Sequence, residues 1–61
     1  MKVKTVHEAI IRTGSGAYTP SKGTVKAEEI LTATMQIDGW SYIPSLEGWI
    51  NDYHLERIAN S

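Results

Sequence analysis

The sequence lacks cysteine, long apolar runs and any marked excess of charge, and each absence excludes a class of protein. Without cysteine the chain can form neither a disulfide framework nor a thiolate metal site. The longest apolar run has three residues (Ala9 to Ile11), and the N-terminus lacks the apolar segment of a signal peptide. Six Lys and Arg against seven Asp and Glu give a net charge of −1, which offers no basic surface to phosphates. We therefore expect no nucleic-acid partner and no membrane insertion.

The length of 61 residues allows one domain, which we assign to residues 1–61 with its core at about residues 3–58. A domain of this size buries only about 60% of the surface that its unfolded chain exposes. The fold must therefore depend on a compact apolar core.

Apolar residues follow a period of two more often than a period of 3.6. Leu31–Ile37 alternates apolar and polar side chains without error, as a half-buried strand requires. Asp38-Gly39 follows as a two-residue turn, and Trp40–Ile43 resumes a β-rich pattern. After a short connection, Gly48–Ile50 forms another strand. Residues 29–51 are thus predicted to form a three-stranded meander.

The two ends of the chain contribute further predicted strands. Val3–Arg12 is predicted as one strand with Ala9 and Ile11 on one face, although Val6–Ala9 also fits a helical turn. Leu55–Ile58 is predicted as the closing strand. Short strands separated by frequent turn signals favour an all-β fold, specifically a small barrel.

A glycine-rich segment, Thr13–Gly23, shows no hydrophobic period and is predicted to be a loop. A loop of this length in so small a domain is typical of a functional segment. Gly14 and Gly16 lack the rest of a dinucleotide fingerprint and the ending of a P-loop, so we do not expect a phosphate site.

Side-chain alternation sorts the residues of the meander between the core and the surface. Trp49 shares a strand face with Glu47, and burying an unpaired carboxylate would be costly in a small domain. Ile43 and Ile50 are therefore predicted to point inward.

The same alternation predicts that Trp40, Tyr42 and Trp49 lie together on the outward face of adjoining strands. Such a patch is suited to binding, but in a small barrel a tryptophan such as Trp40 also serves as a structural lid over the core. The side on which Tyr53 lies depends on a turn before Leu55 that the sequence leaves open.

Four segments in order resemble the bacterial SH3 (SH3b) domain. Ala9–Tyr18 is similar to its "LNVRSGPGTxY" opening, and Gly23–Ala27 is similar to "GTLKKG". Gly39–Ile43 resembles "GWYKV", and Gly48–Leu55 resembles "GWVxxxYL". Together these segments cover most of the chain.

The resemblance implies a non-catalytic SH3-like barrel of five to seven short strands, with no cofactor. Such domains bind bacterial peptidoglycan, at its stem peptides or cross-bridges, and target a cell-wall hydrolase such as a phage endolysin or an autolysin. The implied partners are peptidoglycan and either a full-length lytic enzyme or a second copy of the chain. The implied place of action is the bacterial cell wall, after cytoplasmic production where the domain belongs to a phage lysin.

The ligand-binding residues are assigned from this resemblance and from the outward face. They are Tyr18, Trp40, Tyr42, Trp49, Asp52 and Tyr53. Glu47 and Arg12 are further polar candidates at the rim. For Arg12 the alternative is a brace for the loop, and for Asp52 it is an Asx cap on the turn.

Two other functions fit the sequence. The ending Gly48–Ile58 also resembles SH3 modules that bind proline-rich peptides, although the acidic loop of that class is missing. An assembly domain that uses the aromatic patch as an interface is the third possibility. His7 and His54 show no short metal-ligand spacing, so no metal site is predicted.

Overall fold

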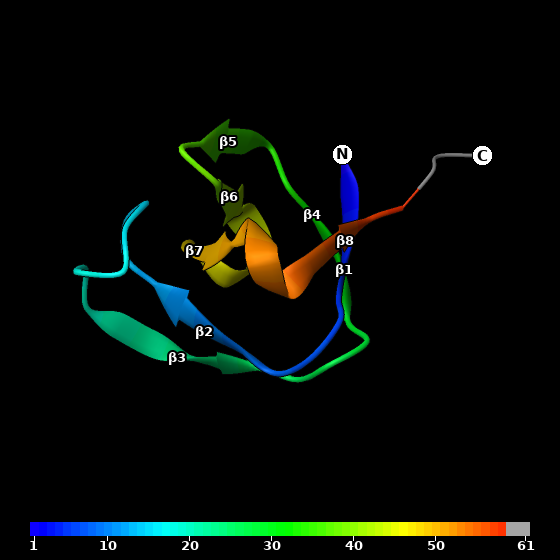
Figure 1. Ribbon diagram of the computed structural model, residues 1–61, viewed down its shortest axis with the longest axis horizontal. Coiled ribbons are helices and arrows are strands. Elements are labelled where there is room, and N and C mark those ends of the chain that lie inside the picture. Colours follow the sequence, from blue (N-terminus) through cyan, green and yellow to red (C-terminus); the bar gives the residue numbers. More distant parts are fainter. Residues whose placement is uncertain (59–61) are drawn as a thin grey trace.

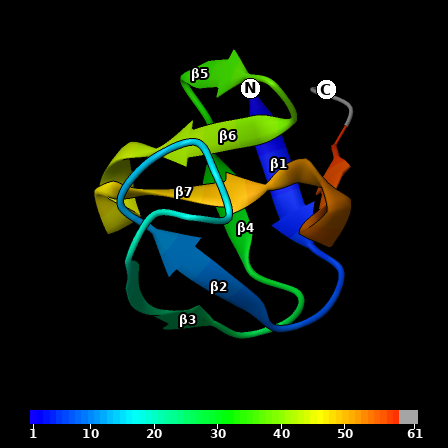
Figure 2. The ribbon, with the colours of Figure 1, turned by 60° about the vertical axis from the view of Figure 1, so that its left-hand side comes forward.

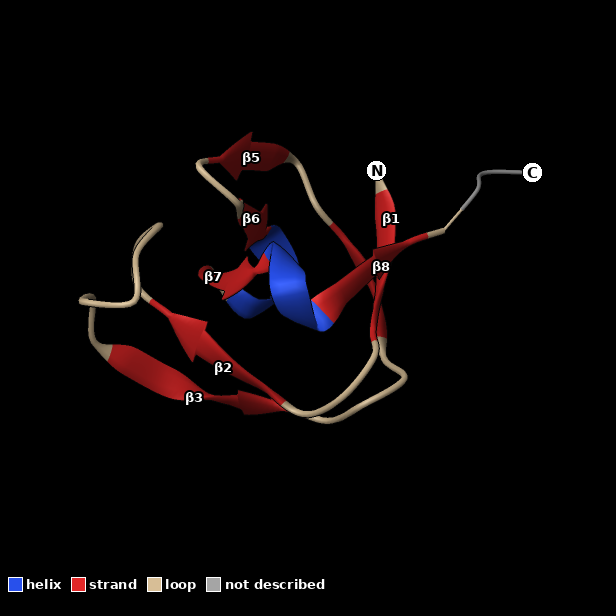
Figure 3. Ribbon diagram, viewed as in Figure 1, coloured by secondary structure: helices blue, strands red, loops and turns tan. Residues whose placement is uncertain are grey.

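Eight β-strands and two 3-10 helices make up the regular structure of residues 1–58, the part of the chain that the computed structural model describes (Figure 1). The elements are β1 (Lys2–Thr5), β2 (Ala9–Arg12), β3 (Ser21–Val25), β4 (Ile30–Thr32), β5 (Met35–Ile37), β6 (Trp40–Ile43), η1 (Pro44–Leu46), β7 (Gly48–Asn51), η2 (Asp52–His54) and β8 (Leu55–Arg57). Figure 3 shows the two short helices in blue; along the chain η1 precedes β7 and η2 follows it. The predicted domain end at Ser61 lies outside the described residues.

The strands form two antiparallel sheets. One has three strands in the order β4-β1-β8, and the other has five in the order β3-β2-β7-β6-β5. The all-β prediction is thus confirmed, with eight strands in the described chain instead of five to seven. The two sheets are not closed into a barrel by backbone pairing.

Two segments that were predicted as single strands are each divided between the sheets. Residues 3–12 contribute β1 to the smaller sheet and β2 to the larger one, and the link between them is a turn, not a helix. Residues 31–37 likewise supply β4 and β5, with the buried Ala33 between them. The prediction was wrong because alternation identifies a face and does not identify the point at which a strand changes partners.

The division of residues 31–37 also changes which side chains are buried. Met35 and Ile37, on the predicted apolar face, are 49% and 41% exposed. The predicted meander is confirmed for β5, β6 and β7, whereas β4 pairs with β1.

The turn at Asp38-Gly39 is confirmed. Ile37 pairs with Trp40 across it, so the loop has two residues, with φ angles of 50° and 84°. Positive φ at both positions is the requirement of the hairpin turn that Asp-Gly favours. The closing strand is also confirmed as β8, which pairs with β1.

The core lies between the two sheets and contains both isoleucines that were predicted to point inward. Ile43 and Ile50 have 0% exposure. The other core members are Val3, Ala9, Ile11, Val25 and Ala33, with Leu31, Leu46 and Leu55 packed against them. Ala9 and Ile11, predicted to share one face of a strand, are thus both in the core.

A glycine permits β2 and β7 to pack closely. A Cβ atom on Gly48 would lie 2.4 Å from Cγ2 of Ile11 and 3.1 Å from the carbonyl oxygen of Arg12. Any side chain here would push apart the two strands that carry the candidate site, described below.

Thr5 fixes β1 to the connection before β4. Its hydroxyl donates to the carbonyl of Lys26 at 2.7 Å and accepts the N–H of Glu29 at 2.9 Å, and the residue is fully buried. Sequence reasoning did not identify this residue, because a threonine on a strand carries no signal of a buried partner.

The predicted loop Thr13–Gly23 is shorter than expected. It ends at Pro20, and Ser21 begins β3, which pairs with β2. Gly23 lies inside this strand with a φ of 145°, and the register of the β2–β3 pair shifts between Ile11 and Arg12. The prediction failed because glycine signals a loop and an irregular strand equally well.

Candidate functional site

Tyr42 and Trp49 face each other across the β6–β7 pair. They occupy directly opposed positions in the register, and their ring centroids lie 5.3 Å apart with planes inclined by 56°. Both side chains are half-buried. Two aromatic rings in this tilted arrangement stabilise each other and leave part of their faces accessible.

The register extends this pair into a row that crosses four strands. Met35 of β5 pairs with Tyr42, and Arg12 of β2 pairs with Trp49. Directly opposed residues of antiparallel strands share a face. We call Met35, Tyr42, Trp49 and Arg12 the cross-strand row. It presents a thioether, two aromatic rings and a cationic side chain in sequence.

Arg12 connects the cross-strand row to the loop of residues 13–20. Its Nη1 donates to the carbonyl of Thr19 at 2.6 Å, and the Thr19 hydroxyl donates in turn to the carbonyl of Gly16 at 2.7 Å. Figure 2 shows the loop, in cyan, crossing in front of β7 toward β6. Arg12 thus braces the loop through this hydrogen bond.

Tyr18 lies in this loop and is 90% exposed. Its ring packs against the backbone of Gly16, where a Cβ atom would come within 2.4 Å of the ring. The loop therefore holds an aromatic ring at the surface.

Trp40 does not belong to an open surface, so the prediction of its exposure was wrong. It is only 8% exposed. It lies in the inner strand β6, between Ile37 of β5 and Asn51 of β7. The alternative of a structural role therefore describes the low exposure of Trp40 better.

Tyr53 belongs to a different part of the molecule. It lies in η2 and is 79% exposed, and its ring lies 5.8 Å from that of His7 and 5.5 Å from that of His54. Within residues 1–58 its ring contacts are with these two histidines and not with Tyr42 or Trp49. We call His7, Tyr53 and His54 the histidine cluster.

Asp52 binds a buried hydroxyl instead of capping the turn. Its Oδ1 accepts the Ser41 hydroxyl at 2.5 Å, and Ser41 in turn accepts Nε2 of Gln36 at 3.2 Å. The cap of η2 is Asn51, whose Oδ1 accepts the N–H of Tyr53 at 2.8 Å. The expected cap was therefore assigned one residue too late, because Asn and Asp carry the same signal for such turns.

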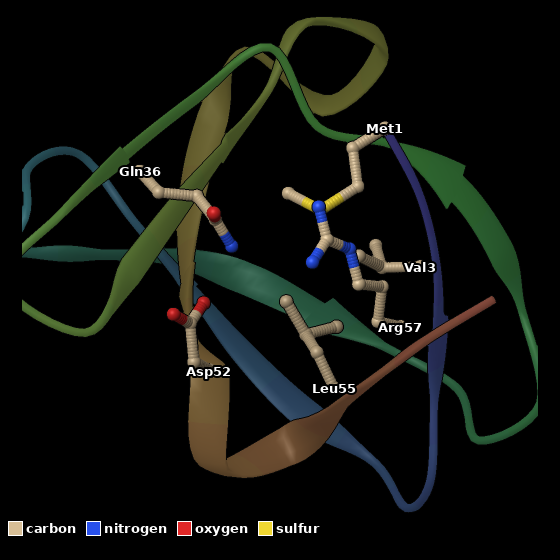
Figure 4. Close-up of a pocket in the computed structure, with 6 residues that line it drawn as sticks. All are labelled: Met1, Val3, Gln36, Asp52, Leu55 and Arg57. Atoms are coloured by element: carbon tan, nitrogen blue, oxygen red, sulfur yellow. The ribbon is translucent and has the colours of Figure 1, made fainter. Parts of the chain in front are cut away.

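Asp52 also lines a small cavity of about 150 Å³ (Figure 4). The lining residues are Met1, Val3, Gln36, Asp52, Leu55 and Arg57. Pockets that enclose small organic ligands generally measure about 300–1,000 Å³. This cavity is too small for such a ligand, and the cross-strand row is the stronger candidate. Glu47, the acidic rim candidate, is exposed in the turn before β7.

The histidine cluster was missed at the sequence level. His7 and His54 are 47 positions apart, yet Nε2 of one lies 2.5 Å from Nδ1 of the other. Burial, and secondly the neighbouring His7, lower the pKa of His54 below 6.5. No spacing rule covers this distance along the chain. Among residues 1–58, no group of three or more His, Cys, Asp or Glu side chains is placed to hold a metal ion.

Comparison of the chain with protein-family models, curated proteins and solved structures yields no match. Within the described residues, no helix combines the length and apolar character needed to cross a bilayer. The function must therefore be argued from the geometry of the site and from the sequence motifs.

Proposed function

We propose that the chain is a non-catalytic binding module of the bacterial SH3 type that recognises peptidoglycan through the cross-strand row. The observation that carries the proposal is the register Met35–Tyr42–Trp49–Arg12, which aligns apolar and aromatic side chains across four strands. Gly- and Ala-rich peptides and sugar rings present C–H surface with few charges, and aromatic faces suit such ligands.

The loop of residues 13–20 supplies the second wall of the proposed site. Arg12 ties the loop to the strand that pairs with Trp49, so we include the exposed ring of Tyr18, which belongs to this loop, in the proposed site. Loops held on a rigid sheet are frequent carriers of binding residues. The guanidinium of Arg12 and the carboxylate of the exposed Glu47 are available to the charged ends of a stem peptide.

The proposed fold is a small SH3-like barrel built from the two sheets. It is supported by the way in which residues 3–12 and 31–37 each pass from one sheet to the other, around a shared core. Barrels of this kind use such bends to wrap few strands around a small core.

The experiment is a binding assay of a fluorescent fusion with purified cell walls from several Gram-positive species. We expect retention on at least one wall type, and at least a tenfold loss of affinity for Trp49→Ala, or about 1.4 kcal/mol. Tyr42→Ala should behave similarly. Thermal unfolding of each variant separates lost binding from lost folding.

Tyr53→Ala is the matched comparison, because it removes an exposed aromatic side chain that lies outside the cross-strand row. We expect wall binding within about twofold of wild type for this variant. An equal loss for Tyr53→Ala would extend the site to η2, as first predicted from the sequence. Wild-type binding by Trp49→Ala would refute the site assignment.

The same fusion should be tested on a proline-rich peptide library and by analytical ultracentrifugation. Binding to peptides in the absence of any wall binding would replace the proposal with the second function. A wild-type dimer that becomes a monomer in the Trp49→Ala variant would replace the proposal with the assembly role. A protein that fails to bind any wall overturns the proposal in either case.

A further inference from the structure

The two imidazole rings of the histidine cluster meet edge to face at the surface. His7 belongs to the turn between β1 and β2, and His54 ends η2. Their ring centroids lie 4.7 Å apart at an angle of 79°, and the facing nitrogens, Nε2 of His7 and Nδ1 of His54, are 2.5 Å apart. Two ring nitrogens that can each ligate a metal ion thus face each other.

The backbones that carry the two rings are held together independently of the side chains. Val6 directly precedes His7 in the chain, and its N–H donates to the carbonyl of His54 at 2.9 Å. Asn51 caps η2, and the N–H of Leu55 closes it on the carbonyl of Asp52. The Tyr53 ring lies against both imidazoles. The convergence of the nitrogens is therefore set by the fold.

The protonation state of the pair favours ligation. One neutral ring is required for the hydrogen bond between the two nitrogens, since two imidazolium rings would oppose two N–H donors. The neutral imidazole is also the form that binds metals, and the contact between the two ring nitrogens already requires one such ring.

We propose that His7 and His54 form a two-nitrogen site for a divalent metal ion of the Zn²⁺, Ni²⁺ and Cu²⁺ class. Imidazole suits these ions, whereas Mg²⁺ and Ca²⁺ prefer oxygen ligands. Water completes the coordination, because the described residues place no third His, Cys, Asp or Glu at the site. This inference is independent of the proposed recognition of peptidoglycan.

The geometry requires a small adjustment of the rings. Tetrahedral Zn²⁺ with Zn–N bonds of about 2.0–2.1 Å places its ligand nitrogens about 3.4 Å apart. The two nitrogens must therefore separate by roughly 0.9 Å from their present contact. His7 is exposed and His54 is only partly buried, so both rings can turn about their side-chain bonds without disturbing the core.

A bound ion would connect two segments that are distant in sequence. It would link the β1–β2 turn to η2 and replace the present hydrogen bond with two metal–ligand bonds. The unfolded chain holds the two histidines 47 positions apart and cannot present them together, so the ion stabilises the folded state selectively.

The test is thermal unfolding of the intact chain at pH 7.5, with ZnCl₂ or NiCl₂ added from zero to a large molar excess and then removed with EDTA. We expect the Tm of wild type to rise by about 4 °C or more in excess metal and to return with EDTA. MgCl₂ should have no effect. His7→Gln and His54→Gln should each abolish the rise.

Tyr53→Phe is the matched control, because it keeps the ring against the histidines and removes only the hydroxyl; its response to metal should equal that of wild type. An unchanged Tm of wild type in excess Zn²⁺ and Ni²⁺, or a full response by His54→Gln, would overturn the proposal.

NMR of the wild-type imidazoles adds a measurement that needs no variant. Zn²⁺ should shift the resonances of His7 and His54 together, and the shifts should saturate at one ion per chain. Shifts of only one ring, or of neither, count against the site.

Discussion

The cross-strand row and the histidine cluster both gather aromatic rings at the surface, but they are built in different ways. The row lies on paired strands, where the register of β5, β6, β7 and β2 determines which side chains adjoin. The cluster lies on a turn and a 3-10 helix that are distant in sequence and meet only in the folded structure. Which side chains share a face of a strand can therefore be predicted from the sequence, because the side chains alternate. A contact between two irregular segments cannot be predicted in this way.

The two regions also depend on different supports. The row requires the close approach of β2 and β7 at Gly48. The cluster follows β1, which the buried Thr5 attaches to residues 26–29. A substitution at Gly48 should therefore affect the cross-strand row first, and a substitution at Thr5 should affect the histidine cluster first.

Gly48→Ala should have the largest effect. The added methyl group would overlap Cγ2 of Ile11 and press on the backbone of Arg12, so we expect a loss of about 3 kcal/mol in the free energy of unfolding. The corresponding fall in Tm is on the order of 10 °C, measurable by circular dichroism. Ser45→Ala, which introduces alanine at an exposed position before β7, should change Tm by no more than about 2 °C. A Gly48→Ala variant as stable as wild type would show that the row does not depend on this approach.

Thr5→Val should have the next largest effect. Valine has the same shape but leaves the N–H of Glu29 and the carbonyl of Lys26 without their buried partner, at a cost of about 2 kcal/mol. Denaturant unfolding measures the loss, and Thr5→Ser, which retains the hydroxyl, should recover part of it. Faster amide exchange at Val6 than at Trp49 would show that the cluster loosens before the row. Equal acceleration at both would mean that the two regions unfold as one unit.

A fall in pH should have the smallest effect, and it should act through the cluster. Since the pKa of folded His54 lies below 6.5, the unfolded chain takes up a proton at higher pH than the folded chain does. The stability contributed by neutral His54 is therefore present above about pH 6.5 and is lost as the pH falls through the pKa of the folded state. Denaturant unfolding from pH 7.5 to 5 measures this loss. His54→Gln should reduce it, and an identical pH profile in wild type and variant would contradict the assignment.

Much of the strand content could be predicted from residue patterns. The Asp38-Gly39 turn, the β6 and β7 strands and the inward direction of Ile43 and Ile50 all follow from local chemistry: a turn that requires positive φ, and apolar side chains that alternate with polar ones. The shared outward face of Tyr42 and Trp49 follows from the same alternation, whereas their direct pairing is set by the β6–β7 register.

Other features could not be predicted locally. Alternation continues unbroken through residues 31–37, although the chain leaves one sheet and enters the other near Ala33. Met35 lies on the apolar face of the predicted half-buried strand, whereas the structure leaves it exposed at the start of the cross-strand row. Alternation placed Trp40 on the outward face and left open whether it binds a ligand or covers the core, whereas the structure leaves it only 8% exposed in the inner strand β6.

The sequence by itself determined an all-β chain, its central hairpin and the inward isoleucines, because these depend on residues within a few positions of one another. Tertiary structure alone decided that residues 31–37 serve two sheets, that Arg12 completes the row beside Trp49 and that His7 meets His54. These contacts join segments up to 47 positions apart. Their geometry depends on how two small sheets pack around one core, which no local pattern of side chains records.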